Sequence, residues 1–175
     1  MLRTSEIAAN YSFQAEEAFV LSAASWFHDA GHLFGKPDGH EVRSVSIMKE
    51  FLRNEQVEIS TLEKIQGCIM ATKIPQDPIT ILEEIICDAD TYHLGTDEFL
   101  YTDILLKGEF ELRNHTKYDD WDMLTLNVLE MHTYFTSYCK HLLNKGKQKN
   151  IEMVREKIGV GLWGDESYIE YCSVI

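Results

Sequence analysis

The adjacent residues His28 and Asp29 are the first candidates for chemistry in this chain of 175 residues. Together they offer a divalent metal one imidazole nitrogen and one carboxylate oxygen, which suits a hydrolytic site better than a structural zinc site built on thiolates. Asp90, far along the chain, could complete the site. A metal held by these three side chains would lower the pKa of a bound water and activate it for attack on phosphorus.

Ordinary structural roles compete with this interpretation. A His-Asp pair often arises by chance, and Asp29 could simply cap a chain end with a hydrogen bond. The metal site is favoured because Asp29 and Asp90 are each expected at the end of an apolar helix, where an uncompensated carboxylate is costly. Asp88 is a weaker candidate ligand, because it lies two residues from Asp90 and points to a different helix face.

Two further histidines could take part. His32 lies four residues after His28, and His40 follows a turn-rich segment over 33–39. Each of the two could bind a metal, donate a proton to a leaving alcohol or form a loop hydrogen bond.

Two cationic side chains could hold a phosphate. Lys73 stands just before a turn at Pro75, at the end of a predicted helix, and could direct its ammonium at a substrate. Arg43 could do the same through charge-assisted hydrogen bonds, and Glu41 is an alternative proton carrier. We expect three catalytic residues: Asp29, His32 and Lys73.

These side chains depend on helices to bring them together. Apolar residues recur at helical spacing over 13–27, so His28 and Asp29 should lie near the carboxyl end of a buried helix, with Gly31 as its terminator. A second helix over 80–90, opened by a capping box, should end at Asp90.

The same reasoning predicts the remaining helices. Their expected ranges are from 40 onward, 60–72 behind a capping box at Ser60, 96–113, and 119–143 before a polar tail. All three prolines fall between apolar segments, and strand-type alternation is absent. The expected fold class is therefore all-α.

Composition limits the classes of protein. With 45% hydrophobic residues the chain can bury one sizeable core, so we expect one domain over 1–158 and a C-terminal tail over 159–175. The net charge of -13 disfavours a nucleic-acid polymer as partner. No apolar run approaches the length of a membrane span, and the four cysteines stand singly, as reduced thiols in a cytoplasmic protein do.

Several short motifs occur in a distinctive order. They are Phe27-His28-Asp29-Ala30-Gly31-His32, Gly39-His40-Glu41-Val42-Arg43-Ser44, Ala71-Thr72-Lys73-Ile74-Pro75-Gln76, Cys87-Asp88-Ala89-Asp90 with Leu94-Gly95, and Tyr134-Phe135-Thr136 with Gly146-Lys147-Gln148-Lys149-Asn150. Over roughly residues 5 to 155 this order resembles the HD superfamily of metal-dependent phosphohydrolases, in particular a bacterial group of small single-domain members.

The resemblance implies a helical bundle of about six to eight helices with a metal site between them. It implies hydrolysis of a small phosphate ester or nucleotide by a metal-bound water. By position, His28, Asp29 and Asp90 match the metal ligands, and His40 matches an additional ligand of two-metal relatives, in which Asp29 would bridge the ions. The cofactor would be a divalent ion, with Mn, Mg, Fe, Ni, Co and Zn all open.

One landmark of the family is missing, because no histidine precedes His28. The family places its first ligand histidine on an N-terminal helix. Three explanations stay open: the sequence begins after that helix, which we favour; His32 or His40 compensates; or metal and activity are lost. The alternative function is accordingly a catalytically impaired HD-fold module for ligand binding or dimerisation, and a homo-oligomer is conceivable in either case.

Overall fold

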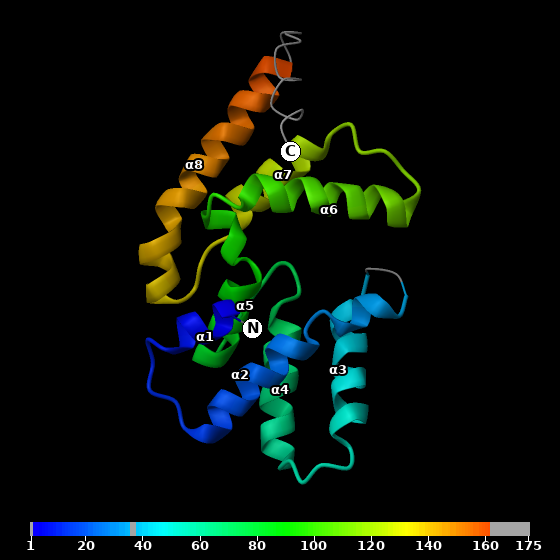
Figure 1. The fold of residues 1–175 in the computed structure, drawn as a ribbon, viewed down its shortest axis with the longest axis vertical. Coiled ribbons are helices and arrows are strands. Elements are labelled where there is room, and N and C mark those ends of the chain that lie inside the picture. Colours follow the sequence, from blue (N-terminus) through cyan, green and yellow to red (C-terminus); the bar gives the residue numbers. More distant parts are fainter. Residues whose placement is uncertain (1, 36–37, 162–175) are drawn as a thin grey trace. The chain divides into compact units, whose positions relative to one another are not determined.

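A computed structural model describes residues 2–35 and 38–161 of the chain. Within those residues the fold is all-α, with eight α-helices, two short 3₁₀ helices and no strand (Figure 1). The elements are α1 (Leu2–Ala8), α2 (Ala15–Phe27), η1 (Ala30–Leu33), α3 (His40–Leu52), α4 (Ile59–Ala71), α5 (Ile81–Asp90), η2 (Tyr92–Gly95), α6 (Phe99–Asn114), α7 (Trp121–Met131) and α8 (Ser137–Gly161). The predicted fold class, an all-α protein of six to eight helices, is confirmed.

The chain forms two compact units. Of the described residues, unit 1 comprises those up to Tyr92 together with Thr133–Leu143, and unit 2 comprises His93–His132 and those from Asn144 to Gly161. Each unit has its own cluster of buried apolar side chains.

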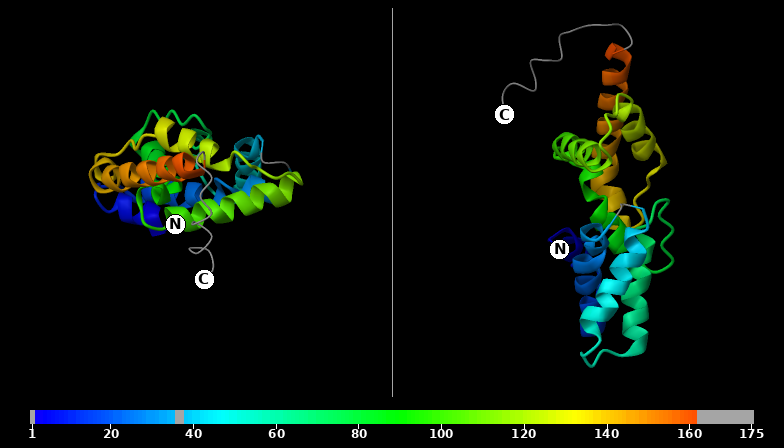
Figure 2. Two further views of the ribbon diagram at one scale, coloured as in Figure 1. Left: turned by 90° about the horizontal axis from the view of Figure 1, so that it is seen from above. Right: turned by 90° about the vertical axis from the view of Figure 1, so that its right-hand side faces the viewer.

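Unit 1 is built around α2, α4 and α5. Helix α2 packs against both α4 and α5, and α3 packs against α2 and α4, as the neighbouring blue, cyan and teal helices in two views show (Figures 1 and 2). The buried centre includes Val20, Met48, Ile65, Ile69 and Ile85, each with no exposed surface. Burying side chains of this size is the main source of stability for such a unit.

Unit 2 combines α6, α7 and the later turns of α8. Its buried cluster comprises Leu94, Phe99, Leu129, Ile151 and Val154. The side-chain amide of Asn150 donates hydrogen bonds of 3.0 Å to the carbonyls of Leu94 and Thr96, which fixes η2 and the start of α6 against α8.

The prediction of a single helix over 119–143 is wrong, because this range contains two separate helices. Helix α7 ends at Met131 and α8 begins at Ser137, then continues to Gly161 where a polar tail was expected. Both carboxylate oxygens of the buried Asp88 accept hydrogen bonds from the intervening segment: 2.8 Å from the amides of Phe135 and Thr136, and 2.6 Å from the Thr136 hydroxyl. A contact this distant in sequence leaves no trace in local periodicity.

The two predicted capping boxes at helix starts have different outcomes. Thr80 caps α5 as expected, since its hydroxyl accepts a hydrogen bond from the Glu83 amide at 3.3 Å. The capping box at Ser60 is wrong: α4 already begins at Ile59 without a side-chain cap. The neighbouring Thr61 hydroxyl donates 2.9 Å to Glu16 of α2, so a tertiary contact fixes the first turn of α4.

Three of the four cysteines, Cys68, Cys87 and Cys139, are buried and free of disulfides, whereas Cys172 lies outside the described residues. The predicted tail over 159–175 also lies outside them from 162 onward. In the part of the chain that the structure describes, no helix combines the length and the apolar run needed to cross a membrane.

Candidate metal centre

The candidate ligands come from four points of unit 1. His28 directly follows α2, Asp29 precedes η1, His40 is the first residue of α3, and Asp90 is the last residue of α5. Asp29 makes no capping hydrogen bond with its side chain, so the alternative role as a helix cap is not realised.

A first group of possible ligand atoms consists of His28, Asp29 and Asp90. The Nε2 atom of His28 lies 3.3 Å from Oδ2 of Asp29 and 3.5 Å from Oδ1 of Asp90. Ligand atoms about 2.1 Å from a tetrahedral ion lie ~3.4 Å from one another. The distances from His28 to the two carboxylates are thus close to those between ligands of one ion, all three ligand atoms lie within 4.8 Å of one another, and three protein ligands leave a position for water.

A second group shares Asp29 with the first. Its Oδ1 atom lies 3.9 Å from Nε2 of His32 and 3.6 Å from Nε2 of His40. The two imidazole rings are stacked with their centroids 3.8 Å apart. Asp29 thus directs one carboxylate oxygen at each group, which is the arrangement that a carboxylate bridging two ions requires.

Contacts beneath the site fix the segment that carries Asp29. The buried Ser44 hydroxyl on α3 donates 2.7 Å to the carbonyl of His28 and accepts 2.8 Å from the amide of Gly31. Arg43 donates from Nε to the Gly31 carbonyl at 3.2 Å. These bonds tie the end of α2 and the start of η1 to the first turns of α3.

Gly31 is not the terminator of α2, as its position in the sequence suggested, because that helix already ends at Phe27. A Cβ atom at position 31 would lie 2.0 Å from the carbonyl oxygen of His40. Glycine is needed there so that η1 can approach the start of α3, which brings Asp29 within reach of His40.

Hydrogen bonding also orients the imidazole of His28. Its Nδ1 atom lies 3.2 Å from the carbonyl oxygen of Ser25. With Nδ1 as donor to that carbonyl, Nε2 is the nitrogen that can bind an ion; without an ion, Nε2 carries a proton that faces the two carboxylates.

The carboxylates dominate the electrostatics of the first group. Burial lowers the pKa of His28, but hydrogen bonds to Asp29 and Asp90 and the charges of both outweigh burial and raise the pKa to about 10. The hydrogen bond from His28 is also the main reason why the pKa of Asp29 lies below its usual value, against the opposing effect of burial. The group therefore favours a positive charge between the two carboxylates, and a divalent ion supplies one.

The other side chains considered from the sequence make no described contact with the ligand candidates or make structural ones. Lys73 is exposed in the turn after α4, and within the described residues no hydrogen bond or ion pair joins its ammonium to the candidate ligands. Arg43 also donates 2.9 Å to the carbonyl of Asp38, so it braces the segment before α3. Glu41 is buried with its Oε2 atom 3.6 Å from Nδ1 of His40, where it can orient that ring.

Sequence reasoning gave no role to α1, yet this helix borders the site. A pocket of about 510 Å³ beside His28 and Asp90 is also lined by Leu2, Arg3 and Thr4. Helix α1 has only seven residues, too few for an apolar periodicity to reveal it.

Comparisons with known proteins add no family to this geometry, since no family model, no curated protein and no solved structure matches the chain.

Proposed function

We propose that this protein is a metal-dependent phosphohydrolase that acts on a small phosphate ester or a nucleotide. The observation that supports the proposal most is the position of Asp29, whose two carboxylate oxygens face two separate groups of nitrogen and oxygen donors. The ordered motifs that resemble the HD superfamily support it independently.

In this proposal His28, Asp29 and Asp90 hold the first divalent ion, and Asp29, His32 and His40 hold a second. A bound divalent ion supplies a Lewis acid for the phosphoryl oxygens and lowers the pKa of water. The protein keeps the donor atoms in place: Ser44 fixes the backbone of His28, Ser25 orients its ring and Glu41 faces the ring of His40.

The number of ions decides the role of His32. With one ion in the first group, His32 is available to donate a proton to the leaving alcohol, and Asp29 Oδ1 orients its ring. With two ions, His32 is a ligand.

We assign the hydrolase to the cytoplasm, because three buried thiols without disulfides fit a reducing compartment. The net negative charge of the chain disfavours polymeric nucleic acids as substrates.

The composition of the first group favours a second candidate function. Among its described members, His28 is the single nitrogen ligand. The second candidate is a helical module that has lost hydrolysis and uses the same pocket to bind a ligand or to dimerise. A protein that takes up no metal and gains no thermal stability from Mn²⁺ would favour the module.

Metal titration and turnover test the enzyme. We expect calorimetry to detect Mn²⁺, Mg²⁺, Ni²⁺ or Co²⁺ binding, and the loaded protein to hydrolyse p-nitrophenyl phosphate or a member of a nucleotide panel. Asp29→Ala should weaken metal binding at least about 100-fold, because it removes a ligand of both groups. Asp77→Ala, which removes an exposed carboxylate of the same unit, is the matched control and should change neither property. Metal-dependent turnover that survives Asp29→Ala would exclude this site.

A further inference from the structure

The pocket beside the first ligand group is lined by a cationic side chain. It is lined by His28 and Asp90 of that group, by Arg3 from α1 and by an apolar wall of Leu2, Ile86 and Ala89. Among the described residues that line this pocket, Arg3 is the only lysine or arginine. A guanidinium next to apolar surface and two metal-ligand candidates is suited to a molecule with an anionic end and an organic end.

Contacts on both sides hold Arg3 in position. Its Nη1 atom donates 3.0 Å to Oε2 of Glu6, and its guanidinium carbon lies 4.4 Å above the centre of the Tyr92 ring. Glu6 is itself fixed, because its Oε1 atom accepts hydrogen bonds of 2.6 Å from Tyr92 and 3.0 Å from Tyr138. Since Tyr92 follows Asp90 by two residues, the guanidinium is held near the end of α5 that carries the ligand candidate.

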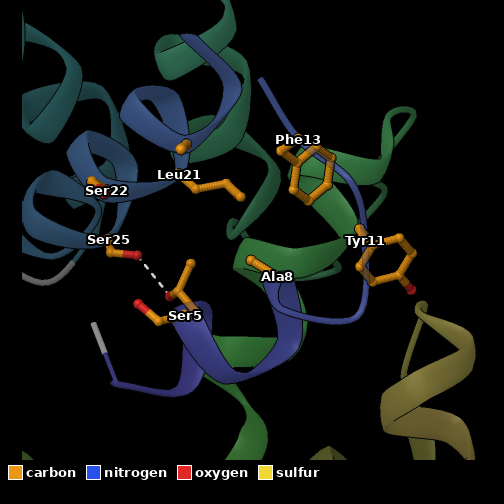
Figure 3. Close-up of a pocket in the computed structure, with 9 residues that line it drawn as sticks. Ser5, Ala8, Tyr11, Phe13, Leu21, Ser22 and Ser25 are labelled. Atoms are coloured by element: carbon orange, nitrogen blue, oxygen red, sulfur yellow. Dashed lines mark hydrogen bonds between the residues drawn. The ribbon is translucent and has the colours of Figure 1, made fainter. Parts of the chain in front are cut away.

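A neighbouring pocket of about 320 Å³ lies between α1 and α2 (Figure 3). The hydrogen bond of 2.7 Å from Ser25 to Thr4 marks the boundary, since both residues line both pockets. None of the described residues that line this smaller pocket has a charged side chain. The pocket of Arg3 is therefore the better suited of the two to an anionic substrate.

We propose that Arg3 is a specificity residue that binds the phosphoryl oxygens of a phosphomonoester, while Leu2, Ile86 and Ala89 contact a compact apolar organic group of the substrate. The assignment rests on the proposed hydrolase, because the phosphate must sit beside the ions of the first group. Asp90 alone would repel a phosphate, whereas an ion on that carboxylate and the guanidinium together attract it. Arginine is suited to the task because its planar donors match phosphate geometry.

Calorimetry on the Mn²⁺-loaded protein tests the assignment with phenylphosphonate as the probe. This compound carries a phosphorus–carbon bond in place of the ester linkage. We expect Arg3→Ala to weaken phenylphosphonate binding about tenfold or more and Arg3→Lys to weaken it less, because lysine keeps the charge but not the paired donors. With p-nitrophenyl phosphate the same variants should raise KM and leave kcat nearly unchanged. Arg53→Ala is the control, since Arg53 forms a comparable exposed ion pair with Glu50 at 3.2 Å.

The outcomes separate this inference from the proposed function. Unchanged phenylphosphonate affinity in Arg3→Ala, with turnover intact in the unmodified protein, overturns the role of Arg3 and leaves the hydrolase standing. Arg3-dependent phenylphosphonate binding without any turnover overturns the hydrolase but supports the pocket. Methylphosphonate binding as tightly as phenylphosphonate would overturn the assignment of the apolar wall.

Discussion

Gly31 has no chemistry of its own, yet it determines where the ligand candidates lie. The absence of a side chain lets the backbone of η1 approach the first residue of α3, and Ser44 then joins Gly31 to the end of α2. Asp29 and His40 come within reach of each other as a result. The geometry of the site therefore depends on a close backbone contact as much as on the ligands.

Gly31→Ala should be strongly destabilising. The added Cβ would lie 2.0 Å from the His40 carbonyl oxygen, so backbone must move, at an expected cost of about 2–4 kcal/mol in the free energy of unfolding. Gly108→Ala is the control, because Gly108 is exposed in α6 and a Cβ atom there would meet nothing within 4 Å. This substitution should raise the free energy of unfolding by about 0.5–1 kcal/mol. Urea denaturation measures both, and equal stabilities for the two variants would contradict the close approach.

At the residue scale the sequence singled out most of the side chains that the structure gathers. His28, Asp29 and Asp90 form one group, and His32 and His40 join Asp29 in the other; their binding of metal stays a prediction. These residues were found because a polar pair beside an apolar segment is visible locally. The place of Arg3 beside the site was not, since it arises from packing of α1 and from contacts with Tyr92.

Among the elements, helix existence was easier to predict than helix ends. Periodicity identified α2 through α5, because each buries one face against neighbours. Helix α6 was also predicted, although Phe99 is the one buried residue among its described side chains. Periodicity missed the break between α7 and α8, where the amides of Phe135 and Thr136 and the Thr136 hydroxyl donate to the distant, buried Asp88. The start of α8 also uses Thr136, whose hydroxyl accepts 3.1 Å from the Cys139 amide while donating to Asp88. One carboxylate thus positions the helix through its N-cap residue.

Asp88→Ala should therefore detach the start of α8. Loss of the carboxylate leaves three buried or half-buried donors from Phe135 and Thr136 without their acceptor, at an expected cost of about 2–4 kcal/mol. Asp88→Asn keeps one acceptor oxygen and should cost less. Amide exchange at Phe135 and Thr136 reports the local effect, with the exposed Asp119→Ala as a control expected within about 0.5 kcal/mol. Slow exchange at both amides in Asp88→Ala would refute the anchoring role.

At the scale of the whole molecule, the two buried clusters determine which core the candidate site depends on. All ligand candidates belong to unit 1, as do the residues that orient them. Unit 2 has a separate buried cluster that contains none of them. Damage to the core of unit 1 should thus affect metal binding more than damage to the core of unit 2.

Truncation of one buried residue in each unit distinguishes these consequences. Ile85→Ala and Leu129→Ala both remove a side chain with no exposed surface, and each should cost about 2–5 kcal/mol. Hydrogen exchange should accelerate mainly in α2, α4 and α5 for Ile85→Ala, and mainly in unit 2 for Leu129→Ala, because each residue belongs to a different cluster. Leu129→Ala should keep its affinity for Mn²⁺, whereas Ile85→Ala, on the helix that ends at Asp90, should weaken it. Equal acceleration throughout the described helices in both variants would mean that the two clusters unfold as one cooperative unit, so that the metal site depends on the core of unit 2 as well.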